Sequence, residues 1–311
     1  MNDQSASFEK RYKAFISYSH SDNREDGRKW ADWLHHQLET YEVPEELVGQ
    51  KNQLGEPIPA QIFPVFQDEK ELAASSDLNS SLKEALNHAE FLVYLSSPQS
   101  ARSPYVREEL RYFKQIGKSK KIIALIIKGE PIYDDNFSEQ QCFPEELRYA
   151  VDADGQVIKD KPEEVLAADV RIPHTQDEGF TSIEAYRHSL ETKGVSRKQL
   201  KNSIEDYKNR LDLAVLKIVS GILHVPLGEF TKRDKAYQLE KIKRKHRQTK
   251  RIAIAITILA VIAIITGIFA VQQKNFALKN LARSLYNSGI NKLTESEFGD
   301  GAAYIAEATR Q

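Results

Sequence analysis

One carboxylate in this chain, that of Glu109, has a sequence context suited to chemistry. The Ser103-Pro104 pair predicts the start of a helix, because serine favours the N-cap and proline the first turn, and Glu109 falls in the second turn. The apolar stripe of this helix consists of Val106, Leu110 and Phe113. Glu109 lies on the neighbouring stripe, together with Tyr105 and Tyr112. A carboxylate beside aromatic side chains can stabilise a positive charge that develops during a reaction.

Signatures of several other chemistries are absent from the sequence. The chain contains no P-loop, no glycine-rich dinucleotide fingerprint, no H-E-x-x-H and no G-x-S-x-G. The single cysteine, Cys142, excludes an internal disulfide and a multi-cysteine zinc site, and the eight histidines are scattered. We therefore predict no metal site. A phosphoacceptor role for Asp68 is disfavoured, because that chemistry needs acidic residues after the first strand, where this chain has Ser-Tyr-Ser-His.

The elements that must position Glu109 alternate between strand and helix periodicity. Apolar, β-prone runs predict strands at residues 12–18, 62–66, 91–96 and 122–127. Apolar residues at helical spacing predict helices at residues 27–41, 78–89 and from Ser103 onward. Pro64 indicates that the second strand lies at an edge or contains a bulge. The order predicts an α/β fold with a parallel sheet and helices on both of its faces.

Polar residues gather at the carboxyl ends of three of these strands. Tyr18-Ser19-His20 follows the first strand, and Gln67-Asp68-Glu69 follows the second. Ser96-Ser97 ends the third strand and leads to the helix that carries Glu109. Ligands of parallel α/β sheets bind at this edge, so the topology alone predicts a site there.

The second half of the chain has a looser pattern and then a helical one. Residues 133–194 contain many Pro, Asp and Gly residues, with one short strand expected at 170–172. Residues 198–223 have strong helical periodicity, which Pro226 ends. A further helix is expected from Leu227 through a basic stretch.

Twenty residues, 252–271, carry no charge and are long enough as a helix to cross a bilayer core. Seven lysines and arginines lie within 241–251, and three more widely spaced ones follow the span. The positive-inside rule then places the N-terminal part in the cytoplasm of a single-pass cell-membrane protein, with the lipid bilayer as a partner. The formal net charge of −1 argues against a nucleic-acid partner.

Three stretches, in order, resemble a known family. F-I-S-Y-S-H-S-D, residues 15–22, resembles box 1 of Toll/interleukin-1 receptor (TIR) domains. F-Q-D-E-K-E-L, residues 66–72, resembles the box 2 region, where the BB loop leaves the second strand. The run 78–110, which ends in S-P-Y-V-R-E-E-L, resembles the stretch ending in S-x-W-C-x-x-E-L. The resemblance covers residues 12–129 and implies a flavodoxin-like TIR domain.

We therefore expect five parts along the chain. A TIR domain spans 1–132, a mixed loop and helical extension 133–225, and a basic helical linker 226–251. The transmembrane helix spans 252–271, and a short extracytoplasmic helical tail spans 272–311. The segments 142–149 (C-F-P-E-E-L-R-Y) and 168–171 (A-D-V-R) are similar to a bacterial subset of TIR proteins, in which WD40 or TPR repeats often follow the span. This subset implies a role in bacterial immunity.

The resemblance also implies an activity and its residues. Some TIR domains are enzymes that cleave NAD⁺ at the nicotinamide–ribose bond, and their catalytic glutamate falls on Glu109. NAD⁺ is then the substrate, and no separate cofactor is needed. Phe66 is expected to stack on a ring of the substrate, and the binding set is completed by Tyr18, Ser19, His20, Asp68 and Tyr105.

Two classes of function stay open at this point. The first is an NAD⁺ nucleosidase that acts after self-association through its TIR domain, and the second is a non-catalytic scaffold that binds other TIR proteins. The scaffold is favoured by departures from the family pattern: Tyr105 stands in place of Trp, Val106 in place of Cys, and box 2 is altered at Gln67 and Ser75. A relative of the nucleoside deoxyribosyltransferases is a third, weaker alternative.

Overall fold

The computed structural model describes the whole chain except residues 1–10, 68–77, 133–138, 295–297 and 311. The strands are β1 (Tyr12–Ser17), β2 (Val65–Gln67), β3 (Ala89–Ser96), β4 (Ile122–Ile126), β5 (Tyr149–Val151), β6 (Val157–Pro162) and β7 (Leu166–Asp169). The α-helices are α1 (Trp30–Glu39), α3 (Leu78–His88), α4 (Pro98–Arg102), α5 (Pro104–Gln115), α6 (Glu145–Arg148), α7 (Ile183–Thr192), α8 (Arg197–Leu223), α9 (Leu227–Thr294) and α10 (Phe298–Arg310). Two 3₁₀ turns, η1 (His20–Asn23) and η2 (Ser119–Lys121), follow β1 and precede β4.

Five strands form a parallel sheet in the order β2-β1-β3-β4-β7. This arrangement confirms the predicted parallel α/β fold. The edge position of β2 agrees with the expectation from Pro64, which directly precedes the strand. Strand β2 lies on one side of β1 and β3 on the other, so the strand order reverses between β1 and β3. Parallel α/β sheets bind ligands at such a topological switch point.

The fifth strand of the sheet lies a few residues earlier in the chain than expected. A short strand was expected at 170–172, but β7 comprises Leu166–Asp169, which pair with Ile123–Ile126 of β4. Ala168 is buried in the core. The sheet therefore extends past residue 132 and takes its last strand from the segment expected to be an extension. Without β7, the backbone groups along that side of the buried strand β4 would have no strand partner.

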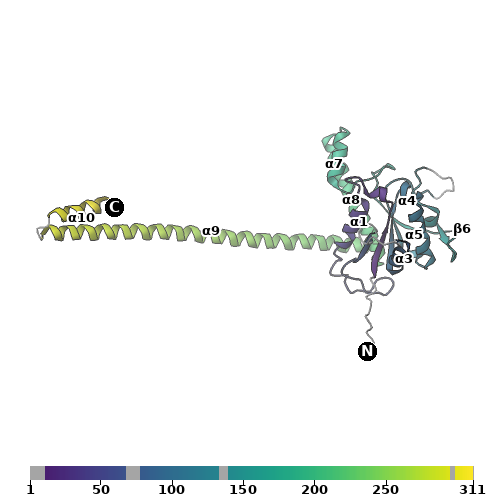
Figure 1. Cartoon of the computed structure of the whole chain (residues 1–311), viewed down its shortest axis with the longest axis horizontal. Coiled ribbons are helices and arrows are strands. Elements are labelled where there is room, and N and C mark those ends of the chain that lie inside the picture. The colour runs from purple at the N-terminus through teal and green to yellow at the C-terminus, as the bar shows by residue number, and fades with distance from the viewer. Residues whose placement is uncertain (1–10, 68–77, 133–138, 295–297, 311) are drawn as a thin grey trace, which may run out of the picture. The chain divides into compact units, whose positions relative to one another are not determined.

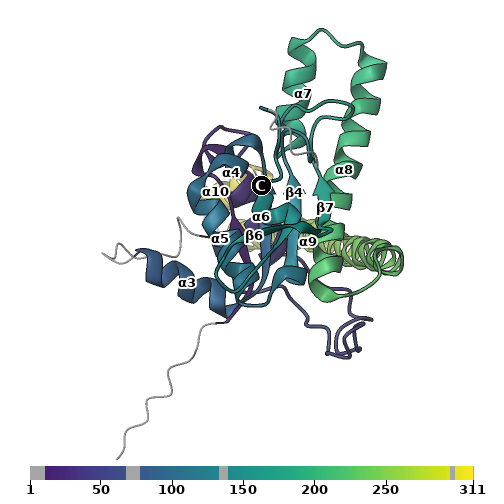
Figure 2. The ribbon, with the colours of Figure 1, turned by 90° about the vertical axis from the view of Figure 1, so that its right-hand side faces the viewer.

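Two hydrophobic clusters cover the two faces of the sheet. One contains Trp30 and Leu34 of α1 with the inner side of α8, from Tyr207 to Leu223. The other contains Leu86 of α3 with the apolar stripe of α5. Figure 2 shows α8 and the pair α3–α5 on opposite sides of the strands. The predicted stripe of Val106, Leu110 and Phe113 faces the second cluster, and this orientation fixes the direction of Glu109.

The chain divides into two compact units, residues 1–237 and 238–311, of which the second contains most of α9. Among the described residues, one helix is long and apolar enough to cross a membrane, and it is α9. Figure 1 draws α9 as one continuous helix that includes the predicted span 252–271. The side chains of this span are exposed, which distinguishes it from the core helix of a soluble protein.

Candidate active site

Glu109 is buried at the carboxyl edge of the sheet and touches the end of β1. Its side chain is 8% exposed. The Oγ of Ser17 donates a hydrogen bond to Oε2 of Glu109 over 2.5 Å, between residues 92 positions apart in the chain. The bond orients the carboxylate toward the topological switch point of the sheet. A buried carboxylate with a fixed direction is suited to stabilising a cationic reaction centre.

The sequence analysis did not identify Ser17 as a site residue and selected the three residues that follow it, Tyr18, Ser19 and His20. Side chains alternate across a strand, so Ser17 shares the face of Phe15, which packs in the cluster of α5. Tyr18 points to the other face and is buried in the cluster of α1 and α8, so it does not reach the Glu109 pocket. This alternation was readable from the sequence and would have identified Ser17.

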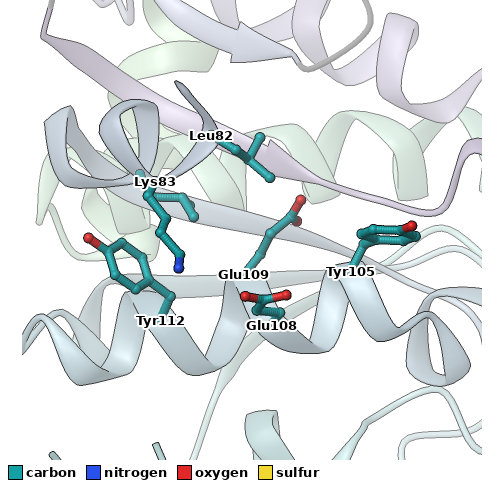
Figure 3. Close-up of a pocket in the computed structure, with 7 residues that line it drawn as sticks. Leu82, Lys83, Tyr105, Glu108, Glu109 and Tyr112 are labelled. Carbon is teal, nitrogen blue, oxygen red and sulfur yellow. The ribbon is translucent and has the colours of Figure 1, made fainter. Parts of the chain in front are cut away.

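Helices α3 and α5 enclose a small pocket around Glu109. It is lined by Leu82, Lys83 and Leu86 of α3 and by Tyr105, Glu108, Glu109 and Tyr112 of α5 (Figure 3). Its volume of about 20 Å³ gives room for about one water molecule. Tyr105, one of the predicted binding residues, lines the pocket and is 72% exposed. The described walls therefore leave little room for a nucleotide between α3 and α5.

The other predicted binding residues lie in different surroundings. Phe66 was expected to stack on a substrate ring, but its ring is buried, lies parallel to that of Phe15 with centroids 4.9 Å apart, and meets the edge of Tyr12. It supports the sheet rather than the pocket, because its strand turns it into the core. His20 is exposed, with its ring 5.5 Å from that of Tyr18. Asp68 lies outside the described residues.

Ser19 belongs to a second polar cluster that fixes the turn after β1. Its backbone N–H donates to Oγ of Ser100 over 3.2 Å, and Asp22 accepts hydrogen bonds from Ser97 and Ser100 over 2.6 and 2.8 Å. Burial raises the pKa of Asp22 above its ordinary value, and these two hydroxyls partly counteract it. The cluster joins η1 to the first turn of α4, so it holds the end of β1, and with it Ser17, in place.

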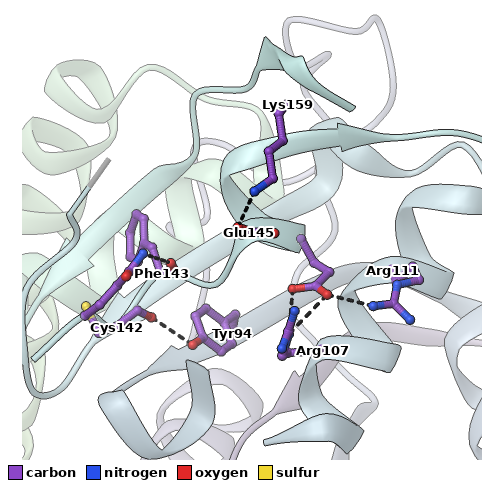
Figure 4. A network of polar contacts seen from close by, with 9 residues as sticks. Tyr94, Arg107, Arg111, Cys142, Phe143, Glu145 and Lys159 are labelled. Carbon is purple, nitrogen blue, oxygen red and sulfur yellow. Dashed lines mark hydrogen bonds and ion pairs between the residues drawn. The ribbon is translucent and has the colours of Figure 1, made fainter. Parts of the chain in front are cut away.

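The face of α5 opposite Glu109 is held by polar contacts with the segment 142–163, which we call the clamp; on α5 it involves Arg107, Arg111 and Lys114. The fully buried carboxylate of Glu146 accepts one bifurcated hydrogen bond from Nε of Arg107, 3.1 and 2.9 Å from its two oxygens, and one hydrogen bond from Arg111 over 2.7 Å. Nζ of Lys114 donates to two backbone carbonyls and to Glu163. Figure 4 shows both arginines converging on one carboxylate, beside the hydrogen bond between Tyr94 and the carbonyl of Cys142. The clamp sets the rotation of α5 and therefore the direction of Glu109.

The described part of the chain contains no candidate metal site. No group of three or more His, Cys, Asp and Glu side chains is arranged there to hold an ion. The site consists of the carboxylate of Glu109 oriented by the Ser17 hydroxyl, a second carboxylate from Glu108, aromatic and apolar walls, and the ammonium group of Lys83. It suits the breaking of a bond whose leaving group already carries a positive charge.

Comparison with known proteins agrees with this geometry. A family model described as the TIR domain matches residues 14–164. The protein "NAD(+) hydrolase ApTIR" of Actinoplanes sp. (strain ATCC 31044 / CBS 674.73 / SE50/110) is 31% identical to this chain over 124 residues. The matched stretch covers 40% of this chain and 15% of that relative. The parallel sheet, the position of Glu109 and the family match together identify residues 14–164 of this chain as a TIR domain.

Proposed function

We propose that this chain is a membrane-anchored signalling protein whose TIR domain cleaves NAD⁺ at the nicotinamide–ribose bond when copies of the chain associate. The observation that carries the proposal is the buried carboxylate of Glu109, oriented by Ser17 at the pocket between α3 and α5. The similarity to a protein named as an NAD(+) hydrolase supports it.

The chemistry requires little beyond this carboxylate. The bond between C1′ of the ribose and the pyridinium nitrogen breaks, and its electron pair leaves with nicotinamide, which becomes neutral. Because the leaving group starts as a cation, no proton donor is needed. The ribose becomes an oxocarbenium-like cation that the Glu109 carboxylate stabilises. Attack by water at C1′, with loss of a proton, gives linear ADP-ribose, and attack by an adenine nitrogen gives a cyclic product.

The small volume of the pocket makes association part of the proposal. The space that the described residues leave beside Glu109, about 20 Å³, is much smaller than a nicotinamide ring. Contact with a neighbouring TIR domain is expected to move the exposed Tyr105 and to complete the wall of the site. Anchoring in a membrane through residues 252–271, with the basic stretch 241–251 on the cytoplasmic side, raises the local concentration of TIR domains and favours this contact.

The test measures nicotinamide release from NAD⁺ by the full chain in liposomes at low and high protein density. We expect release that increases with density and is lost in Glu109→Gln. Glu84→Gln is the matched control, because Glu84 is an exposed residue of α3 that does not line the pocket. Release that persists unchanged in Glu109→Gln would refute the role of this carboxylate.

The small volume of the pocket also favours a second candidate, the non-catalytic TIR–TIR scaffold. In that case Glu109→Gln leaves association and signalling intact, while substitutions in the box 2 segment 68–72 abolish them. Absence of nicotinamide release at every protein density, together with normal association, would support the scaffold. Loss of signalling in Glu109→Gln alone, with association retained, would exclude it.

A further inference from the structure

The pocket around Glu109 has negative charges on one of its helices and a positive charge on the other. Its carboxylates, Glu108 and Glu109, belong to α5, and among the described lining residues Lys83 of α3 is the only cation. Figure 3 shows Lys83 reaching from α3 across the pocket toward Tyr112, with Glu109 in the middle and Tyr105 at the opposite end. NAD⁺ is divided in the same way, with a cationic nicotinamide at one end of a ribose and a negatively charged pyrophosphate at the other.

The position of Lys83 is supported by neighbouring side chains. Its Nζ lies 5.7 Å from the centroid of the Tyr112 ring, within the range of a cation–π contact. Nδ2 of Asn87, one helical turn further along α3, donates a hydrogen bond of 2.8 Å to the Tyr112 hydroxyl. The two helices thus hold the Tyr112 ring between them, and this ring keeps the ammonium group over the pocket.

The spacing along α5 fits the dimensions of the substrate. Tyr112 follows Glu109 by three residues, which is about 4.5 Å along the helix axis. This distance is comparable with the span of a ribose from C1′ to its 5′-phosphate. A substrate with C1′ at Glu109 and its ribose directed along α5 toward Tyr112 brings its first phosphate to the end of the pocket where Lys83 lies.

We infer that Lys83 is the phosphate-binding residue of this site, which pairs with the pyrophosphate of a dinucleotide while Glu109 faces the nicotinamide ribose. The inference rests on the proposed function, because it assigns the two ends of the same substrate. It makes the site selective for phosphorylated nicotinamide ribosides and gives α3 a direct part in recognition. An exposed lysine contributes modestly, so its loss weakens substrate binding without removing the reaction.

The first arm of the test compares two substrates of the full chain in liposomes. In Lys83→Gln we expect KM for NAD⁺ to rise about two- to fivefold, with kcat within about twofold of the wild type. Kinetic constants for nicotinamide riboside, which has no phosphate, should be the same in both proteins. Lys83→Arg keeps the charge and should restore KM for NAD⁺. Lys193→Gln, at an exposed lysine that ends α7, is the matched control.

The second arm measures binding of ADP-ribose by equilibrium dialysis. This ligand has the pyrophosphate but no nicotinamide, so its binding is measurable whether or not the chain is an enzyme. We expect the Kd to rise in Lys83→Gln by the same factor as KM and to stay unchanged in Lys193→Gln. Binding of ADP-ribose that depends on Lys83, without nicotinamide release, would refute the proposed enzyme and retain the phosphate site. Cleavage of NAD⁺ and binding of ADP-ribose that are equal in wild type and Lys83→Gln would overturn the phosphate site alone.

Discussion

Replacement of Glu146 by glutamine tests whether the clamp on α5 stabilises the TIR domain. The substitution keeps the shape of the side chain and removes its charge. In the wild type the carboxylate of Glu146 is fully buried and accepts hydrogen bonds from Arg107 and Arg111. Glutamine has one acceptor oxygen and an NH₂ group that would face a guanidinium, so the paired geometry is lost.

The size of the effect follows from the exposure of the partners. Breaking a fully buried ion pair costs about 3–5 kcal/mol. Here the side chains of Arg107 and Arg111 are 40% and 39% exposed, so both arginines can turn to water after the substitution. We therefore expect the free energy of unfolding to fall by about 2–3 kcal/mol, near the cost of a lost charge-assisted hydrogen bond.

The assay is urea unfolding of the full chain in liposomes, followed by tryptophan fluorescence. The two tryptophans of the chain, Trp30 and Trp33, both lie in α1, so the signal reports on the unit formed by residues 1–237. Glu145→Gln is the matched control, because Glu145 is the adjacent residue but pairs with Lys159 at the surface. Its substitution should cost less than about 1 kcal/mol.

The pH dependence gives a second check on the same residue. Burial opposes the charge of Glu146, but hydrogen bonds from Arg107, its own backbone and Arg111 outweigh burial and lower its pKa below the ordinary value of 4.5. The stabilisation is therefore present above about pH 4.5 and is lost as the pH falls through the lowered pKa. The free energies of unfolding of wild type and Glu146→Gln should therefore become more similar in that acidic range. Equal stabilities of Glu146→Gln and Glu145→Gln at pH 7 would refute the reasoning.

Three further predictions concern the site, the thiol and the membrane span. Ser17→Ala should lower kcat for nicotinamide release by about tenfold, because Glu109 loses a buried hydrogen-bond donor; an unchanged kcat would contradict the orienting role. Burial raises the pKa of the Cys142 thiol to about 11. Mass spectrometry should therefore find no alkylation by iodoacetamide at pH 7.5 in the folded chain and one adduct in urea. Rapid labelling of the folded chain would contradict this burial. Deletion of 252–271 should move the expressed chain from the membrane pellet to the supernatant, and retention in the pellet would argue against the span.

Most of the fold could be predicted from the sequence because the relevant signals are local. The strands β1, β3 and β4 and the helices α1, α3, α5 and α8 have apolar residues at the spacing of one face or as a continuous buried run. The box motifs indicated the family, and the Ser103-Pro104 start placed Glu109 on a helix at the edge of the sheet. The length and apolar character of residues 252–271 likewise predicted the span directly.

The candidate site depended more strongly on tertiary structure. The hydrogen bond between Ser17 and Glu109 joins residues that are 92 positions apart, and its formation depends on the strand order and on the rotation of α5. Phe66 has the residue type of a stacking group, but its burial against Phe15 is decided by the pairing of β1 with β2. Periodicity within one segment carries no information about such pairs.

The sequence by itself determined the main strands and helices of the first 130 residues, the helix that carries Glu109, and the helix that can enter a membrane. Each of these properties depends on residue type and spacing over fewer than about twenty residues. Only the tertiary structure decided that β7 completes the sheet, that Glu146 binds α5 on the face opposite Glu109, and that the pocket at Glu109 has room for about one water molecule. Those properties depend on how distant segments pack, because pairing and volume arise between elements rather than within them.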